Sequence, residues 1–187
     1  HDGEYMLMVE GRYYLSGGTS SYGFEVQGVD VEDDTPVTLG TIVDATIAQK
    51  GQTDRFTFSL DETTRVYFDS LTTNAAWDSG NLRWALTGPD GTVVSDRPFS
   101  QSDSYEGLSL MTLGPGDYTL TVTTVAEITG AYRFRLIDVD APTVVEPDTV
   151  VTGTLDPSNG TLVYAFDAVA GRRYYFTGTA GSGDIYW

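Results

Sequence analysis

Cysteine is absent from this chain of 187 residues, and histidine and lysine each occur once, as His1 and Lys50. Without cysteine the chain has no disulfide framework, no thiol nucleophile and no thiolate metal site. Because no histidine or cysteine exists apart from His1, zinc sites are excluded, and no internal histidine is available as the base of a catalytic triad. A copper site at His1 would likewise need a second histidine. No apolar run approaches the 18 residues that indicate a membrane-spanning helix.

Positive charge is also scarce, because ten basic residues face 27 acidic ones and the formal net charge is −17. Phosphate groups are bound by clustered lysine and arginine, so this surface disfavours nucleic acid and anionic membranes. It suits either a solvated acidic surface or the binding of hard cations. With 40% hydrophobic and 12% aromatic residues, the chain can nevertheless fill a core.

What the sequence does contain is a long internal repeat, in which several stretches return after 103 to 110 positions. The related pairs are residues 11–15 and 116–120, 22–26 and 132–136, 56–58 and 164–166, 66–68 and 174–176, and 81–84 and 184–187. A period of this length indicates tandem domains, because solenoid repeats are shorter. We therefore expect a complete unit over residues 35–141. Residues 1–34 would end a preceding unit with its acidic linker, and residues 142–187 would begin a following unit.

Apolar residues alternate with polar ones along most of the chain, which predicts β-strands with one buried face. Turn signals rich in glycine, proline and asparagine separate these runs. The predicted fold class is all-β, with tandem antiparallel β-sandwiches of jelly-roll-like form. Within the complete unit we expect strands near 37–47, 54–60, 64–70, 81–87, 91–95, 108–112, 117–124 and 131–137.

Three groups of motifs, taken in order and spacing, resemble the bacterial pre-peptidase C-terminal domains and their relatives in large surface proteins. They are TGTLD (152–156) with YAFDAVAGRRYYF (164–176), LRWALTGPDG (82–91), and LGPGDYTLTV (113–122) with GAYRF (130–134). The resemblance implies a β-sandwich that is non-catalytic, exported and often present in tandem. Some relatives accompany secreted peptidases, and others are spacers in adhesins and giant surface proteins.

Acidic residues gather at the two predicted connectors between units. They are Asp30, Glu32, Asp33 and Asp34 in the first connector, and Asp138 and Asp140 in the second. Calcium takes six to eight oxygen ligands, so these side chains with backbone carbonyls are calcium candidates that would stiffen a tandem array. The alternative is a solvated linker that charge repulsion holds extended. No EF-hand or nonapeptide calcium motif decides between them.

Aromatic side chains are the other candidate binding groups, because sugar rings stack on exposed aromatic faces. Trp77 lies in the predicted loop 74–80 and is the candidate for ligand binding, although a loop aromatic also commonly covers the end of a sandwich. Trp84 and Trp187 occupy equivalent positions of the repeat, which favours a place in the core.

These observations predict a non-enzymatic, extracellular or cell-surface repeat module that acts as a structural spacer or assembly unit of a large bacterial surface, filament or adhesin protein. The alternative is an accessory module of a secreted hydrolase or peptidase that binds a polysaccharide or protein substrate. Calcium is the one cofactor that the sequence suggests. The expected partners are neighbouring repeats or head-to-tail copies of the chain, without nucleic acid and without membrane insertion.

The two flanking parts carry nearly complementary portions of a unit, and three explanations are open. The sequence belongs to a longer chain, or the two parts complete each other between neighbouring molecules by strand complementation. The third explanation is that they pair within one molecule.

Overall fold

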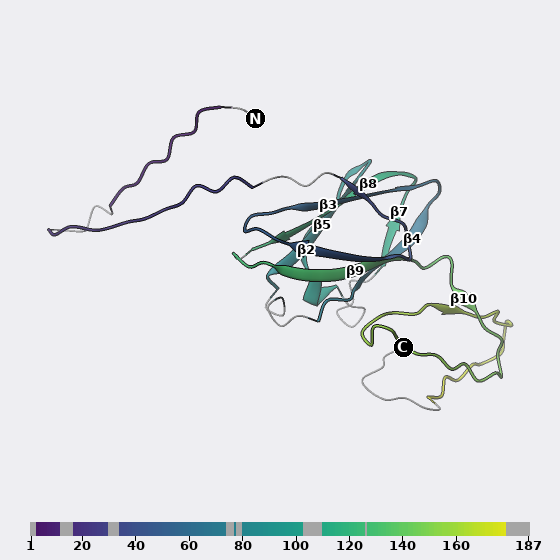
Figure 1. The fold of residues 1–187 in the computed structure, drawn as a ribbon. Helices are drawn as coiled ribbons and strands as arrows, with labels where there is room; N and C mark the ends of the chain where they lie inside the picture. The colour runs from purple at the N-terminus through teal and green to yellow at the C-terminus, as the bar shows by residue number, and fades with distance from the viewer. Residues whose placement is uncertain are drawn as a thin grey trace.

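A computed structural model of the chain describes residues 3–11, 17–29, 34–73, 77, 80–102, 110–125 and 127–178. Within these ranges, strands between Thr35 and Asp138 form a β-sandwich. An N-terminal segment (described over residues 3–11 and 17–29) and a C-terminal segment (residues 142–178) leave this sandwich on opposite sides (Figure 1). The described part of the chain contains no helix long and apolar enough to cross a membrane.

The observed strands follow the alternating hydrophobic pattern of the sequence. They are β1 Thr35–Pro36, β2 Ile42–Ile47, β3 Asp54–Leu60, β4 Thr64–Ser70, β5 Leu82–Gly88, β6 Gly91–Pro98, β7 Leu110–Leu113, β8 Gly116–Thr124 and β9 Gly130–Asp138. A 3₁₀ turn, η2 (Phe99–Gln101), follows β6, and the short strands β10 (Thr143–Val144) and β11 (Tyr164–Ala165) lie in the C-terminal segment. All eight predicted strands are present, and only the first has an end that differs by more than three residues.

The predicted strand over 37–47 is wrong at its beginning, because the chain changes sheets there. β1 pairs with β3, and only residues 42–47 form a ladder with β9. Between them Gly40 has a φ of +84°, a conformation that favours glycine, and its N–H donates to Leu136 O at 2.6 Å. Val37 and Leu39 pack against the core during this crossing. Their alternation therefore reflects burial at the edge of the sandwich and not a continuous strand.

Two sheets make up the sandwich. One has the strand order β1-β3-β8-β5-β6 and the other has the order β2-β9-β4-β7. Only β1 and β3 pair in parallel, and the other ladders of the sandwich are antiparallel. The prediction of an all-β, antiparallel sandwich is confirmed. β8 forms the middle of the first sheet, and β9 and β4 together form the middle of the second.

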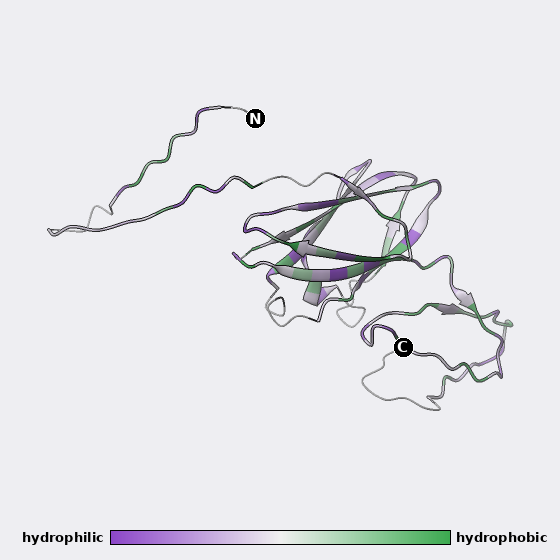
Figure 2. Cartoon of the chain, viewed as in Figure 1, coloured by the Kyte–Doolittle hydropathy of each residue, from purple (hydrophilic) through white to green (hydrophobic). Residues whose placement is uncertain are grey.

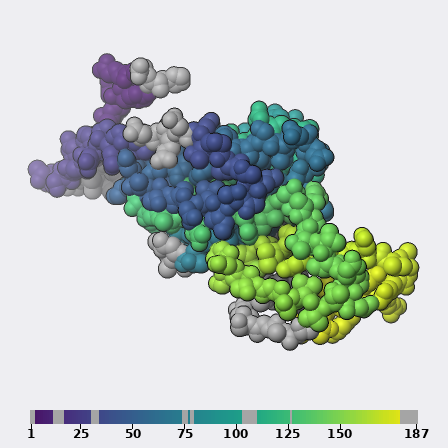
Figure 3. Space-filling view, turned by 45° about the vertical axis from the view of Figure 1, so that its right-hand side comes forward, coloured from purple at the N-terminus to yellow at the C-terminus, as the bar shows by residue number. Residues whose placement is uncertain are grey.

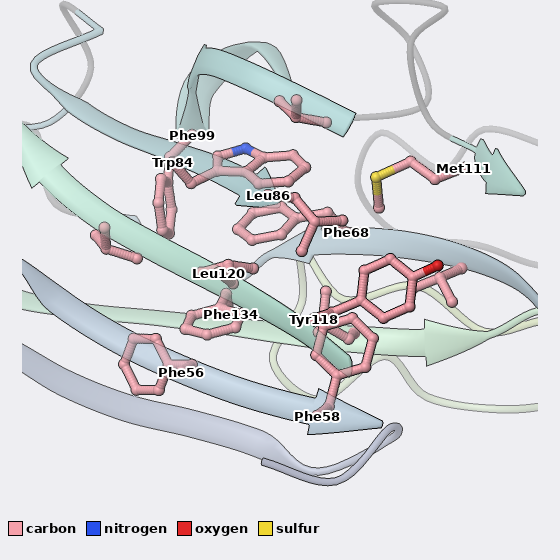
Figure 4. Close-up of a cluster of buried hydrophobic side chains, with 14 of the residues drawn as sticks. Phe56, Phe58, Phe68, Trp84, Leu86, Phe99, Met111, Tyr118, Leu120 and Phe134 are labelled. Atoms are coloured by element: carbon pink, nitrogen blue, oxygen red, sulfur yellow. The ribbon is translucent and has the colours of Figure 1, made fainter. Parts of the chain in front are cut away.

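Aromatic side chains from both sheets fill the space between the layers (Figure 4). The Phe68 ring stacks on Trp84 with centroids 4.1 Å apart and on Phe134 with centroids 5.3 Å apart. Phe99 meets the edge of Phe68 at 5.1 Å. Offset and edge-to-face pairs of this kind add to the stabilisation that burial provides. Phe68 on β4 thus joins a β5 ring in the opposite sheet to a β9 ring in its own.

The alternation predicted for β3 is also confirmed. Phe56, Phe58 and Leu60 are buried, at 4%, 6% and 9% exposure, while the residues between them lie outward. Figure 2 shows hydrophobic and hydrophilic positions following each other along the strands of the sandwich. One buried face per strand is what allows two sheets to pack with their other faces outward.

Truncation of Phe68 should cost more stability than truncation of an exposed apolar residue of the same sandwich. We expect Phe68→Ala to lower the free energy of unfolding by about 3–5 kcal/mol, because it leaves a cavity between stacked rings. Val93→Ala, at a residue 44% exposed on β6, should change it by less than about 0.5 kcal/mol. Urea unfolding followed by tryptophan fluorescence measures both, and equal losses would contradict this account of the core.

Candidate functional site at the C-terminal junction

The residues that follow β9 are fixed to the neighbouring strand β4. Arg65 donates its backbone N–H to Asp140 Oδ2 at 2.7 Å and its Nε to Oδ1 at 2.7 Å. In return, the N–H of Val139 donates to Arg65 O at 2.9 Å. The hydrogen bonds from the backbone and the side chain of Arg65 lower the pKa of Asp140 below its ordinary value. The connector is therefore anchored, and Arg65 holds it through both its backbone and its side chain.

A second contact between the sandwich and the C-terminal segment centres on Asp69 of β4. Its side chain is 2% exposed and pairs with Arg135 of β9, whose Nη2 lies 2.6 Å from Asp69 Oδ2. Thr161 of the C-terminal segment donates its hydroxyl to Asp69 Oδ1 at 3.0 Å. Thr161 O accepts a hydrogen bond from Arg135 Nη2 at 2.9 Å. Both members of this ion pair therefore form hydrogen bonds with the C-terminal segment.

The turn before Thr161 packs on the end of β4. Asn159 Nδ2 donates to Ser70 O at 3.2 Å, and the N–H of Gly160 donates to Pro157 O at 2.8 Å. A Cβ on Gly160 would lie 3.0 Å from Pro157 O and 3.7 Å from Leu71 Cδ2. Glycine therefore relieves crowding within the turn itself, whereas the distance to Leu71 is an ordinary van der Waals contact with the sandwich.

We name the set Arg65, Asp69, Arg135, Asp140 and Thr161 the C-terminal junction. Sequence reasoning found only Asp140 among these residues. The signal in the sequence was the uninterrupted apolar run of Val66, Tyr67 and Phe68, which departs from alternation. In the structure Tyr67 and Asp69 are buried as well as Val66 and Phe68. Burial on both faces of a strand means that something covers its outward face, and here the turn of the C-terminal segment lies over that end of β4.

The other predicted calcium ligands are only partly described. Asp30, Glu32 and Asp33 lie outside the described residues. Asp34 pairs with Arg55 at 2.6 Å, and Asp138 Oδ1 accepts the N–H of Asp140 at 2.8 Å. Over the described ranges, no group of three or more acidic, histidine or cysteine side chains is placed to hold a metal ion. Calcium binding at the connectors stays a prediction from the sequence.

Of the two outcomes considered for Trp77, the structure shows the one in which the ring covers the end of the sandwich. Its side chain is 2% exposed, and its Nε1 donates to Ala131 O on β9 at 3.0 Å. The ring covers the end of the sandwich, so it does not offer the open face on which a sugar would stack. Trp84 is in the core as predicted, at 1% exposure, and Trp187 lies outside the described residues.

One further buried carboxylate serves the fold. Asp54 is 3% exposed and accepts hydrogen bonds from Gln52 Nε2 at 2.6 Å and from the hydroxyl of Tyr132. Gln52 Oε1 in turn accepts the N–H groups of Ala48 and Gln49 at 2.7 and 3.0 Å. Through these hydrogen bonds Asp54 and Gln52 fix the turn between β2 and β3, which is a structural role.

Comparison with known proteins gives similarity at the level of fold. No protein-family model and no curated protein matches the sequence. Among solved structures, the chain is similar to the pre-peptidase C-terminal domain of a collagenase from Bacillus anthracis. That match has a TM-score of 0.44 and 17% identity, and covers 56% of this chain and 95% of that one.

A second solved structure with a similar fold is PliG of Salmonella Typhimurium, a periplasmic inhibitor of g-type lysozyme. Here the TM-score is 0.39 and the identity 16%, with 56% of this chain and 99% of that chain covered. The predicted resemblance to pre-peptidase C-terminal domains agrees with the first of these two matches.

Removing the Arg65 side chain should raise the pKa of Asp140. In Arg65→Gln we expect the carboxyl carbon of Asp140 to titrate at higher pH than in the wild-type chain, toward the ordinary range, because the guanidinium no longer favours the charged form. Since the folded pKa is depressed, the contact contributes above the unfolded pKa of Asp140 and is lost as the pH falls through the folded value. NMR titration of the carboxyl carbons measures this, and an unchanged titration of Asp140 would contradict the assigned cause.

Proposed function

We propose that this chain is a non-catalytic structural module of an extracellular or cell-envelope bacterial protein, in which β-sandwich units follow one another and act as a spacer or assembly unit. The observation that carries this proposal is a ladder that occurs twice. β1 pairs with β3 through Thr35 opposite Phe56, and β10 pairs with β11 through Thr143 opposite Tyr164. Thr143 and Tyr164 lie 108 positions after Thr35 and Phe56, and this displacement is the spacing of the sequence repeat.

The hydrogen bonds beside these ladders have the same displacement. The N–H of Val37 donates to Thr57 O at 2.8 Å, and the N–H of Val145 donates to Ala165 O at 2.8 Å. Parallel pairs are uncommon in this otherwise antiparallel chain, so their recurrence in the same register is specific. It supports the interpretation of residues 142–178 as the first part of a following sandwich unit.

The C-terminal junction supports a mechanical role. A spacer transmits position only if neighbouring units are held at a fixed angle, whereas a flexible linker leaves them independent. Here the connector is bound to Arg65, and the turn at Thr161 is bound to the Asp69–Arg135 pair. Breaking such a buried pair is costly because it leaves a charge without its partner.

Loss of the junction contacts should loosen the C-terminal segment. We expect Asp69→Ala to accelerate amide hydrogen exchange at Gly160 and Thr161 and to broaden the distribution of dimensions in small-angle X-ray scattering. Thr161→Val removes only the hydroxyl bond to Asp69. Amide exchange in the turn should then rise by about fivefold, the factor that corresponds to the net free energy of one hydrogen bond. Both variants leave the core residues in place.

The matched controls are Asp61→Ala and Thr154→Val, which change the same residue types at exposed positions. Neither should alter exchange in the turn. If Asp69→Ala leaves the exchange rates and the scattering unchanged, the junction does not hold the segment and the spacer proposal loses its mechanical basis.

Calcium stiffening of the connectors belongs to the same proposal, on the grounds of the acidic residues around Asp34 and Asp138. Ligand that binds only the folded state raises the melting temperature by mass action. Millimolar calcium should therefore raise the melting temperature relative to EDTA, and magnesium at the same concentration should have a smaller effect because it keeps its own water shell. Identical melting in calcium and EDTA would remove calcium and leave the spacer role standing.

A further inference from the structure

The turn that packs on the end of β4 contains the only asparagine of the chain that is followed by glycine. The three asparagines are Asn74, Asn81 and Asn159, and the residues after them are alanine, leucine and glycine. The main-chain nitrogen of the following residue can attack an asparagine side chain, and a side chain on that residue hinders the attack. Glycine has no side chain to do so. Asn159 and Gly160 are therefore the pair in which this attack is least hindered.

The attack converts the side-chain amide of Asn159 into a carboxylic acid without an enzyme. The Gly160 nitrogen bonds to Asn159 Cγ, the Cγ–Nδ2 bond breaks, and Nδ2 leaves as ammonia with the proton that the Gly160 nitrogen carried. The product is a five-membered succinimide ring. Water then opens the ring at one of its two carbonyl carbons. Opening at Cγ gives aspartate, and opening at the main-chain carbonyl carbon gives isoaspartate.

In the closed junction both reacting groups are engaged with other atoms. Asn159 Nδ2 donates to Ser70 O at 3.2 Å, and the N–H of Gly160 donates to Pro157 O at 2.8 Å. Figure 3 shows the C-terminal segment, in light green to yellow, lying directly against the sandwich. The nitrogen of Gly160 can reach Asn159 Cγ only after the turn has given up these two hydrogen bonds.

Thr161 keeps the turn in its closed position. Its N–H and its hydroxyl donate to the two carboxylate oxygens of Asp69 at 3.3 and 3.0 Å, and its carbonyl accepts from Arg135 Nη2 at 2.9 Å. When a reaction starts from an opened state and opening is fast, its rate follows the population of that state. The contacts of Thr161 should therefore slow the reaction at Asn159.

Neither product fits the closed junction. A carboxylate at position 159 only accepts hydrogen bonds, so it faces Ser70 O, which is also an acceptor, without a proton between them. Isoaspartate also lengthens the main chain before Gly160 by one carbon–carbon bond, about 1.5 Å. Hydrogen-bond distances vary by only about 0.5 Å, so the contacts of Thr161 with Asp69 and Arg135 cannot all survive that insertion.

We propose that Asn159–Gly160 is a spontaneous modification site that the closed junction protects and whose acidic product keeps the junction open. Water is the only co-reactant. Each opening of the junction gives the reaction another chance, and the loss of ammonia makes the change permanent. The site therefore records the mechanical history of the connection. This inference rests on the proposed function, because it assigns the consequence of the modification to the junction that holds neighbouring units.

The rate of the reaction tests the protection. The whole chain is incubated in mildly alkaline buffer, and peptide mass spectrometry follows conversion at each asparagine. We expect conversion at Asn159 to exceed that at Asn81, because Asn81 precedes Leu82, which pairs with Thr124 in the β5–β8 ladder. Thr161→Val should accelerate conversion at Asn159 by about fivefold, the factor for one net hydrogen bond, and Asp69→Ala by about 25-fold, the factor for two.

Three controls accompany these rates. Thr154→Val, at an exposed position of the same segment, should leave conversion at Asn159 unchanged. Urea removes the protection altogether and should give the fastest rate. Asn159→Gln keeps a side-chain amide, but it would have to close a six-membered ring, which is much slower, so this variant should stay unmodified.

Amide hydrogen exchange at Thr161 tests the consequence. In the freshly prepared Asn159→Asp variant it should be about fivefold faster than in fresh wild type, because the bond to Ser70 O is lost. Aged wild type that contains isoaspartate should exchange faster still. Aged Asn159→Gln should exchange like its fresh sample.

Three results would each overturn the proposal. The first is conversion at Asn159 no faster than at Asn81, and the second is a rate in the folded chain equal to that in urea. The third is unchanged exchange at Thr161 after conversion. The spacer role is judged separately, from fresh Asp69→Ala chain that has not been modified. If that variant loosens the C-terminal segment while aged wild type keeps its Asn159 amide, the spacer proposal stands and the modification site is wrong.

Discussion

The alternation of side chains along β4 and β9 is the constraint on which the rest of this structure depends. On the inner face of this pair, Phe68 and Phe134 stack between the sheets. One position further on each strand, Asp69 and Arg135 form a buried ion pair on the outer face. A shift of either strand by one residue would exchange these faces and place charges in the core. One register therefore holds both the sandwich and the contact with the C-terminal segment.

The chain has only ten basic residues, and one of them, Arg135, forms the ion pair with Asp69. Seven of the ten basic residues form ion pairs with aspartate or glutamate in the described structure. Most of these pairs are solvent-exposed, and exposed pairs contribute little to stability. The pair of Asp69 and Arg135 differs because the Asp69 side chain is only 2% exposed and because Thr161 bonds to both members. The excess acidic charge stays at the surface, where it favours solubility and repels other polyanions.

The repeat places related side chains in two different settings within the described chain. A β-strand in the middle of a sheet satisfies its backbone on both edges and buries its apolar face, whereas a lone strand leaves both exposed. Phe134 and Phe68 are buried in the sandwich, whereas their sequence counterparts Phe24 and Phe176 are 62% and 71% exposed in the described structure.

The sequence by itself determined the strands, the turns and the repeat, because these depend on short-range alternation and on the backbone preferences of glycine, proline and asparagine. It therefore predicted β3, β4 and β9 closely and placed Trp84 in the core. Only the tertiary structure decided that the chain changes sheets near Gly40, that Trp77 covers one end of the sandwich, and that Asp69 meets Arg135. Those outcomes depend on which strands become neighbours, and residues 66 positions apart leave no periodic trace of one another in the sequence.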